Sequence, residues 1–227
     1  MNKNKQEYIV AVAGQPNSGK STVFNMLTGA RQFVANYPGV TVEKRIGIYS
    51  YQGQKIKLVD LPGTYSLTSY SLEERVARNF LINENPDLVL NIADASNLER
   101  HLVLTVQLLE MGMPLVVALN MMDISKGRGF EIDEESLAKE LGVPVVPTIA
   151  QKGRGKEELR QAILKGCLGK DKYKNSLVVD YGQKIEQILD ELTQNIANDN
   201  RYSNYNPRWL AIKLLAGDTE VRSMFHQ

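Results

Sequence analysis

The 227-residue sequence contains one cysteine and two histidines, and each shortage removes a class of site. Because Cys167 is the single cysteine, it cannot form an internal disulfide, which suits a reducing, cytosolic compartment. The cysteine and the histidines together are too few for a structural zinc site. We therefore expect any bound metal to be a hard ion held by oxygen atoms.

Long apolar runs and an excess of positive charge are also missing. No stretch approaches the ~18 apolar residues that a membrane-spanning helix requires, so we expect this fragment to be soluble. The formal net charge of +1 gives no electrostatic reason to expect a nucleic acid as partner. Hydrophobic residues make up 43% of the chain, which is enough to build a full core.

Short apolar runs alternate with segments of helical spacing over the first 168 residues, which we interpret as one domain. Strands are expected at 8–13, 42–51, 54–60, 88–94, 115–120 and 143–146, and helices at 20–28, 72–84, 98–111, 133–141 and 156–165. This alternation predicts an α/β fold with a mostly parallel six-stranded sheet flanked by helices. The segment 31–41, which contains Pro38 and Gly39, is expected to be a loop.

The pattern changes beyond Gly169. Residues 170–175 are polar and charged and suit a linker, and apolar residues then recur at helical spacing from Ile185. We expect residues 172–227 to form a small all-α appendage. It has room for only two or three helices, so it is expected to be truncated or naturally reduced.

A glycine-rich segment between the first strand and the first helix matches the phosphate-binding pattern G-x-x-x-x-G-K-[ST]. Its glycines let backbone N–H groups converge on phosphate oxygens. Lys20 brings positive charge to the β and γ phosphates, and Ser21 offers a hydroxyl to Mg²⁺. The predicted nucleotide-binding residues of this segment are Gly14, Gln15, Pro16, Asn17, Ser18, Gly19, Lys20, Ser21 and Thr22. The pattern predicts a P-loop NTPase, and the later motifs at Asp60–Gly63 and Asn120–Asp123 indicate that its fold is a Ras-like G domain.

Three further residues are expected on the phosphate side. Asp60 closes an apolar strand, where its carboxylate would hold Mg²⁺ through water, and Gly63 leaves its backbone N–H free to approach a γ-phosphate. Thr41, in the expected loop, is the best candidate for a second hydroxyl on Mg²⁺, although a solvated loop threonine explains it equally well.

The choice of base rests on two later segments. Asn120 and Asp123 follow an apolar strand, and an aspartate carboxylate there would accept from N1–H and the 2-amino group of guanine, a donor pair that adenine lacks. Met121 belongs to the same motif. The segment from Thr148 through Ile149 to Ala150 follows the last strand, where a base-supporting loop belongs, with Ile149 at the position of the usual small hydroxyl residue. The predicted ligand is therefore GTP or GDP.

Four segments of the sequence carry a more specific resemblance: GQPNSGKST from Gly14, NYPGVTVE from Asn36, DLPGTYSL from Asp60 and NMMD from Asn120. Together they resemble the cytosolic N-terminal domain of FeoB-type bacterial ferrous iron transporters. The resemblance covers Tyr8 to about Lys165, and the run from Arg208 to Leu215 is similar to part of that family's helical spacer domain.

The resemblance implies a slow, potassium-stimulated GTPase. Ras-like switches place a glutamine directly after D-x-x-G to orient the attacking water, whereas this chain has Thr64 there. In the family, potassium supplies positive charge where an arginine finger otherwise would. By motif match its ligand is Asn17, helped by the carbonyls of Ala35 and Tyr37. The residues expected to act in hydrolysis are Asn17, Lys20, Thr41 and Gly63.

The same resemblance implies regulation of Fe(II) uptake through a transmembrane permease domain, which lies outside these 227 residues, at the cytoplasmic face of the inner membrane. A homo-oligomer is left open. No iron site is expected here, because His101, His226 and Cys167 suit structural or incidental roles. Two alternatives remain: a ribosome-assembly GTPase that binds RNA, and a P-loop ATPase, against which the Asn120–Asp123 motif argues.

Overall fold

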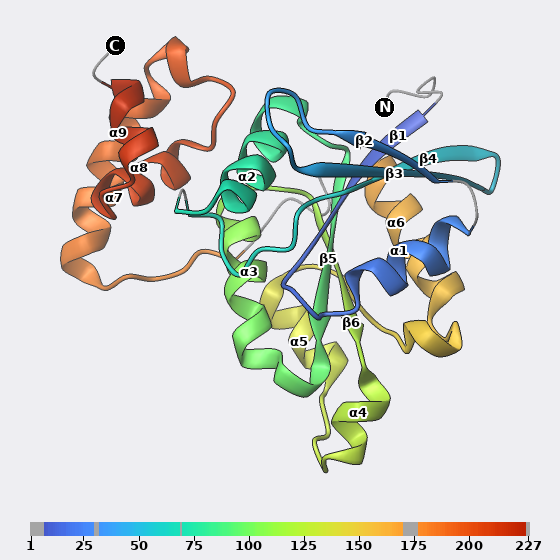
Figure 1. Ribbon diagram of the computed structural model, residues 1–227. Helices are drawn as coiled ribbons and strands as arrows, with labels where there is room; N and C mark the ends of the chain where they lie inside the picture. The colour runs from blue at the N-terminus through green and yellow to red at the C-terminus, as the bar shows by residue number, and fades with distance from the viewer. Residues whose placement is uncertain (1–6, 30–31, 69, 170–176, 226–227) are drawn as a thin grey trace.

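Figure 1 shows a computed structural model that describes residues 7–29, 32–68, 70–169 and 177–225. The expected linker at 170–175 lies outside these residues. Helices and strands alternate through the first part of the chain, and only helices follow it. None of the helices in the described residues is long and apolar enough to cross a membrane.

Seven strands form one sheet in the order β2-β3-β4-β1-β5-β6-β7. Their bounds are β1 (Glu7–Gly14), β2 (Gln32–Asn36), β3 (Glu43–Tyr51), β4 (Gln54–Asp60), β5 (Leu88–Asp94), β6 (Leu115–Asn120) and β7 (Val145–Pro147). The strands β4, β1, β5, β6 and β7 run parallel, while β2 and β3 are antiparallel to their neighbours. These pairings confirm the mostly parallel sheet. Its central strands are buried on both faces, which explains their near-continuous apolar runs.

The edge strand β2 differs from the expectation, since the segment 31–41 was predicted to be a loop and the sheet to have six strands. Gln32–Asn36 pairs with β3 instead, with Phe33 opposite Ile46. Phe33 and Val34 are strand-forming residues, but they are 61% and 65% exposed. A strand without a buried face shows no alternation of apolar and polar residues. The sequence pattern therefore did not predict β2.

Helices cover both faces of the sheet (Figure 1). One apolar cluster joins the sheet to α1 (Lys20–Thr28) and α6 (Lys156–Leu168), through side chains such as Phe24 and Ile163. A second cluster joins the opposite face to α2 (Leu72–Glu84), α3 (Leu98–Glu110) and α5 (Glu134–Leu141). The short helix α4 (Met122–Gly127), which follows β6, was not expected.

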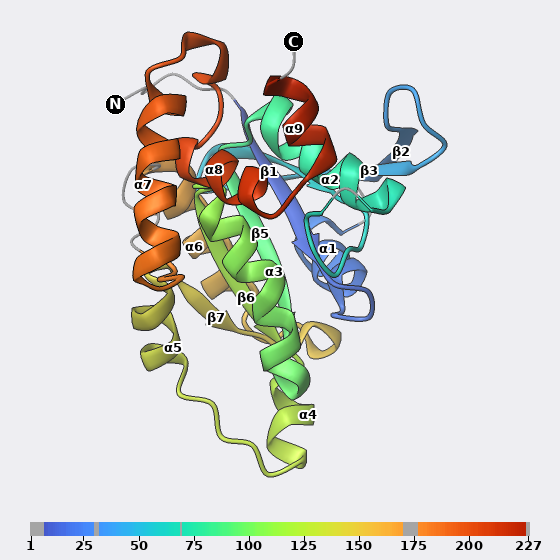
Figure 2. The same cartoon turned by 90° about the vertical axis from the view of Figure 1, so that its left-hand side faces the viewer.

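The helical appendage consists of α7 (Gln183–Ala197), α8 (Pro207–Leu215) and α9 (Thr219–Phe225). Figure 2 shows it lying against α2 and α3 rather than apart from them. Trp209 and Leu210 of α8 are buried in the same apolar cluster as α2 and α3. Asn206 caps α8 by accepting hydrogen bonds from the N–H groups of Arg208 and Trp209, and Pro207 occupies the first helical turn.

An ion pair also joins α2 to the start of α9. Arg78 is 2% exposed and donates to Asp218 at 2.7 Å and to Glu220. A charge this deeply buried needs a charged partner. The helical appendage therefore rests directly on the helix that follows the Asp60–Gly63 segment.

Candidate functional site

The glycine-rich segment lies at the carboxyl end of β1 and turns into α1. Asn17 and Gly19 have φ angles of 67° and 83°, and the N–H of Ser18 donates to the carbonyl of Gln15 at 3.2 Å. Gly14 has no room for a side chain, because a Cβ would lie 2.9 Å from Ser18 Oγ and 3.0 Å from the Ile92 carbonyl. The result is a tight turn directly before a helix N-terminus, the geometry that binds phosphate.

Lys20 and Asp60 meet beside this turn. Val12 and Asp60 are register partners on the adjacent strands β1 and β4, and Lys20 Nζ lies 2.5 Å from Asp60 Oδ1. Burial raises the pKa of the Asp60 carboxyl, and the Lys20 ammonium opposes that rise. A buried carboxylate paired with a lysine suits a site that receives a nucleotide with a divalent cation. The lysine can bind the phosphates there, and the carboxylate can bind the cation.

The residues after Asp60 run alongside the same turn. The N–H of Thr64 donates to the carbonyl of Gly14 at 3.3 Å, and a Cβ on Gly63 would lie 3.5 Å from the backbone nitrogen of Pro16. Thr64 is buried. The structure therefore brings the expected Gly63 segment against the phosphate-binding segment.

The segment between β2 and β3 contacts Asp60 through a residue whose side chain the sequence analysis did not single out. Tyr37 is buried, its hydroxyl donates to the Asp60 carbonyl at 2.9 Å, and its ring meets Phe80 of α2 edge to face at 6.0 Å. Thr41, by contrast, is exposed. Tyr37, rather than Thr41, anchors this segment, and nothing in the mixed run around it distinguished its ring from the exposed Phe33 nearby.

Asn120 joins three segments on the base side of the site. Its Nδ2 donates to the Ser18 carbonyl at 3.1 Å, and its Oδ1 accepts from Thr148 Oγ1 at 3.3 Å and from the N–H of Ala150 at 3.1 Å. A Cβ on Gly19 would lie 2.3 Å from Asn120 Nδ2, so only glycine allows this approach. The two expected base segments are thus fastened to the phosphate segment.

Asp123 lies at the start of α4 and is partly exposed. Its Oδ1 accepts from the N–H of Ile124 at 3.1 Å, and its Oδ2 accepts from Lys152 Nζ at 2.7 Å. The Lys152 hydrogen bond is the main reason that the pKa of the Asp123 carboxyl is lowered. Sequence reasoning missed Lys152, because an exposed lysine in a glycine-flanked turn carries no distinguishing pattern. Met121 adopts a φ of 62° beside this aspartate.

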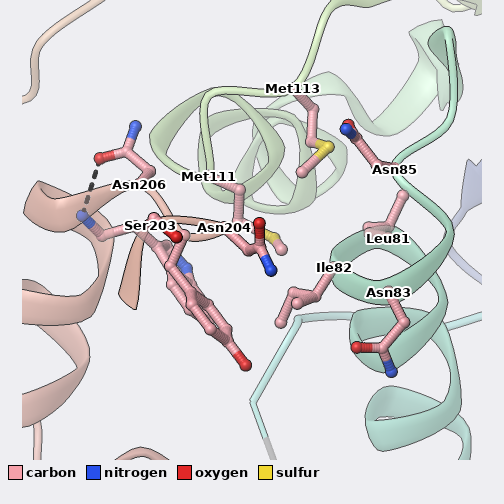
Figure 3. A pocket seen from close by; sticks show the side chains of 11 residues that line it. Leu81, Ile82, Asn83, Asn85, Met111, Met113, Ser203, Asn204 and Asn206 are labelled. Carbon is pink, nitrogen blue, oxygen red and sulfur yellow. Dashed lines mark hydrogen bonds between the residues drawn. The ribbon is translucent and has the colours of Figure 1, made fainter. Parts of the chain in front are cut away.

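A cavity of about 490 Å³ lies elsewhere, between the ends of α2 and α3 and the segment before α8 (Figure 3). Its lining contains no charged side chain and includes Trp209, the single tryptophan of the chain. The residues that line it are Leu81, Ile82, Asn83, Asn85, Met111, Met113, Ser203, Asn204, Tyr205, Asn206 and Trp209. An uncharged lining does not suit a nucleotide triphosphate, so this cavity is not the candidate site.

No cluster of three or more histidine, cysteine, aspartate or glutamate side chains in the described residues is placed to hold a metal ion. His101 is buried in α3 and Cys167 in α6, while His226 lies outside the described residues. The Asp60 carboxylate, 2.5 Å from Lys20 Nζ, and the hydroxyl of Ser21, the residue after Lys20, are hard oxygen donors beside the phosphate segment.

Residues 8–163 match the family described as Ferrous iron transport protein B, and residues 181–227 match the FeoB cytosolic helical domain. The chain is 44% identical over 214 residues to an Fe(2+) transport protein A/Fe(2+) transporter FeoB fusion protein of Porphyromonas gingivalis, covering 93% of this chain and 25% of that protein. It is 43% identical over 221 residues to the Fe(2+) transporter FeoB of Escherichia coli K12, covering 94% of this chain and 27% of that one. The chain thus spans about a quarter of the length of these relatives.

Solved structures agree with the sequence matches. The GDP form of the cytosolic domain of the T. maritima FeoB iron transporter superposes with a TM-score of 0.90 at 42% identity, over 96% of this chain and 85% of that one. The cytosolic domain of L. pneumophila FeoB gives a TM-score of 0.85 at 40% identity, over 93% of this chain and 89% of that one. These matches do not favour the RNA-associated alternative. The chain belongs to the FeoB family of ferrous iron transport proteins.

Proposed function

We propose that this chain binds GTP and hydrolyses it slowly, as the regulatory G domain of a ferrous iron transporter. The observation that carries the proposal is the meeting of three segments at one edge of the sheet, where Asn120 fastens Ser18 to Ala150 while Lys20 lies against Asp60. The T. maritima relative is described in GDP and GMPPNP forms, which supports a guanine nucleotide as ligand.

On the phosphate side, backbone N–H groups of residues 14–19, other than Pro16, which has none, and the Lys20 ammonium would bind the phosphates. The Ser21 hydroxyl and the Asp60 carboxylate would hold Mg²⁺, with Thr41 as the second hydroxyl once its exposed segment closes. Bound Mg²⁺ neutralises charge that develops on the phosphate oxygens. Lys20 would leave Asp60 for the phosphates when nucleotide arrives, and Asp60 would then face the metal.

On the base side, the Asp123 carboxylate would accept from N1–H and the 2-amino group of guanine. Asn120 would hold the neighbouring segments with both ends of its amide, and the second N–H of its Nδ2 would remain for the base. The N–H of Ala150 is also used in this way. The segment from Thr148 to Ala150 therefore supports the site through its fixed backbone, and Ile149 needs no hydroxyl for that role.

For hydrolysis, we propose that the Asn17 amide oxygen holds a potassium ion, together with backbone carbonyls near Ala35 and Tyr37. Asn17 is exposed at the tip of the phosphate turn. Such a cation supplies positive charge in the transition state. Thr64 stands where a water-orienting glutamine would be, so backbone groups near Thr41 and Gly63 would position the water, and turnover would be slow.

Coupling to Fe(II) uptake is proposed from the family, because the relatives are transporters and this chain spans about a quarter of their length. Movement of the Asp60–Thr64 segment on GTP binding would reach α2, and from α2 the helical appendage through Arg78. A membrane permease domain is the proposed receiver.

A competition assay tests the nucleotide specificity. A fluorescent GDP analogue bound to the chain should be displaced by GTP and GDP at concentrations at least about 100-fold below those of ATP, since one site that reads paired donors discriminates strongly. Equal displacement by ATP would refute a guanine site. Turnover in potassium and sodium buffers then tests Asn17: Asn17→Ala should lose the potassium stimulation and keep GDP binding.

A further inference from the structure

Lys152 occupies one oxygen of the carboxylate that the proposed function assigns to guanine. It lies 2.7 Å from Asp123 Oδ2, while Asp123 Oδ1 accepts from the backbone of Ile124. A carboxylate accepts at about four lone-pair positions, so two remain for a base that presents two donors. Lys152 therefore leaves room for guanine and fixes the direction in which the carboxylate faces.

The backbone that carries Lys152 is tightly held. Lys152 ends a short 3₁₀ turn (η2, Ala150–Lys152), and its N–H donates to the Ile149 carbonyl at 2.9 Å. Ile149 and Arg154 form a bridge across the turn. Gly155 is forced to be glycine, because its φ is 81° and a Cβ would lie 2.4 Å from the Pro147 carbonyl. A lysine on such a rigid turn is presented from a fixed position.

The other ties between the two base segments lie deeper and do not reach Asp123. They run through Asn120, which is 3% exposed, to Thr148 and to the N–H of Ala150. They also run through the backbone of Thr148, which donates to the Leu119 carbonyl at 2.8 Å and accepts from the N–H of Met122 at 3.4 Å. Asp123 itself is partly exposed at the first turn of a six-residue helix. Lys152 is thus the side chain from the 148–155 segment that holds Asp123.

We propose that Lys152 is a positioning residue that sets how well the site distinguishes guanine from other purines. Its ammonium ties Asp123 to the 148–155 segment before the base arrives, which removes the need to order this carboxylate during binding. A base with two donors, N1–H and the 2-amino group, gains more from a fixed carboxylate than hypoxanthine, which has N1–H alone. This inference rests on the proposed guanine site.

The test compares Lys152→Met, which removes the charge and keeps the length of the side chain, with Lys152→Arg, which keeps the charge. Lys139→Met, on the exposed face of α5, is the control. Dissociation constants and rates are measured for fluorescent GDP, and those of unlabelled GDP, IDP and ADP follow from competition. In Lys152→Met, GDP should bind about two- to fivefold more weakly, through faster dissociation, as expected for loss of one exposed ion pair.

IDP should lose less affinity than GDP in Lys152→Met, so the ratio of their dissociation constants should shrink, and Lys152→Arg should restore it. An unchanged or tighter GDP affinity in Lys152→Met, or an equal loss for GDP and IDP, would overturn the positioning role. If the unaltered chain prefers GDP over ADP in the same experiment, that failure is confined to Lys152. If it shows no such preference, the proposed function itself fails.

Discussion

Each end of the candidate nucleotide site contains a lysine–aspartate pair, and the two pairs differ in burial. The side chains of Lys20 and Asp60 are 13% and 9% exposed, with Nζ and Oδ1 2.5 Å apart. The side chains of Lys152 and Asp123 are 57% and 34% exposed at nearly the same distance, 2.7 Å. The two pairs have similar distances but different electrostatic interaction energies, because water screens mainly the second pair.

The difference suits what each end has to do. A buried carboxylate that loses its cation is strongly destabilised, so under the proposed function Asp60 would keep Lys20 until phosphate and metal replace it. An exposed pair contributes little free energy, so under the proposed role Lys152 would orient Asp123 at a modest energetic scale rather than supply most of the binding. The phosphate end is thus built to exchange charged partners, and the base end to orient one carboxylate.

The largest effect is expected from Lys20→Met. Removing the ammonium leaves Asp60 buried without its partner, which should lower the free energy of unfolding of the nucleotide-free chain by about 3 kcal/mol. Urea denaturation at pH 7 measures it. The double variant Lys20→Met/Asp60→Asn should recover most of the loss, because no unpaired charge is left. A double variant as unstable as the single one would contradict the role given to burial.

The buried ion pair between Arg78 and Asp218 lies away from the nucleotide site. Breaking it therefore measures the cost of an unpaired buried charge without removing a residue of that site. Arg78→Met leaves Asp218 without its main partner and should cost about 2 kcal/mol of unfolding free energy. The cost should be smaller than for Lys20→Met, because the buried Lys213 also interacts electrostatically with Asp218. GDP affinity, measured with the fluorescent analogue, should change less than twofold. Loss of GDP binding in Arg78→Met would show that the junction between α2 and α9 is needed to keep the nucleotide site in its binding conformation.

Most of this architecture could be predicted from the sequence. The strands that carry Asn120 and the phosphate segment are buried over most of their length, so their apolar runs are long and unambiguous. The strand that ends at Asp60 has one partly exposed face and shows alternating polar and apolar residues instead. The motif residues follow those runs directly. Since the carboxyl ends of parallel strands meet at one edge, the sequence was sufficient to place these residues together.

What could not be predicted lacks such a pattern. Strand β2 is an exposed edge, so its residues do not alternate, and Lys152 is one exposed lysine among many. Tyr37 reaches Asp60 only because β3 folds back beside β4, a contact between residues 23 positions apart. Side-chain contacts between loops produce no periodic pattern in the sequence. They can be identified only from the folded structure.

The pH dependence of the phosphate end sharpens the same comparison at moderate size. The pKa of Asp60 is raised above its ordinary value of 3.8, chiefly by burial. Folding therefore favours its protonated form, and this contribution to stability is full below about pH 4 and lost as the pH rises through the raised pKa. Asp60→Asn removes that dependence, so its stability relative to the unaltered chain should increase with pH over this window in urea titrations. A constant difference would contradict a raised pKa.

The smallest effect is expected from salt, and it distinguishes the two pairs without ambiguity. Raising the salt concentration from 0.1 M to 1 M shortens the screening length from about 10 Å to about 3 Å, which weakens the exposed Lys152–Asp123 pair and leaves the buried one nearly intact. Phosphate binding is also sensitive to salt, so the informative quantity is the ratio of the GDP dissociation constants of Lys152→Met and the unaltered chain. It should fall from between two and five towards one at 1 M salt. A ratio that does not change with salt would mean that Lys152 acts through packing of its aliphatic stem. The two ends of the site would then differ in how their side chains pack, and not in how water screens their charges.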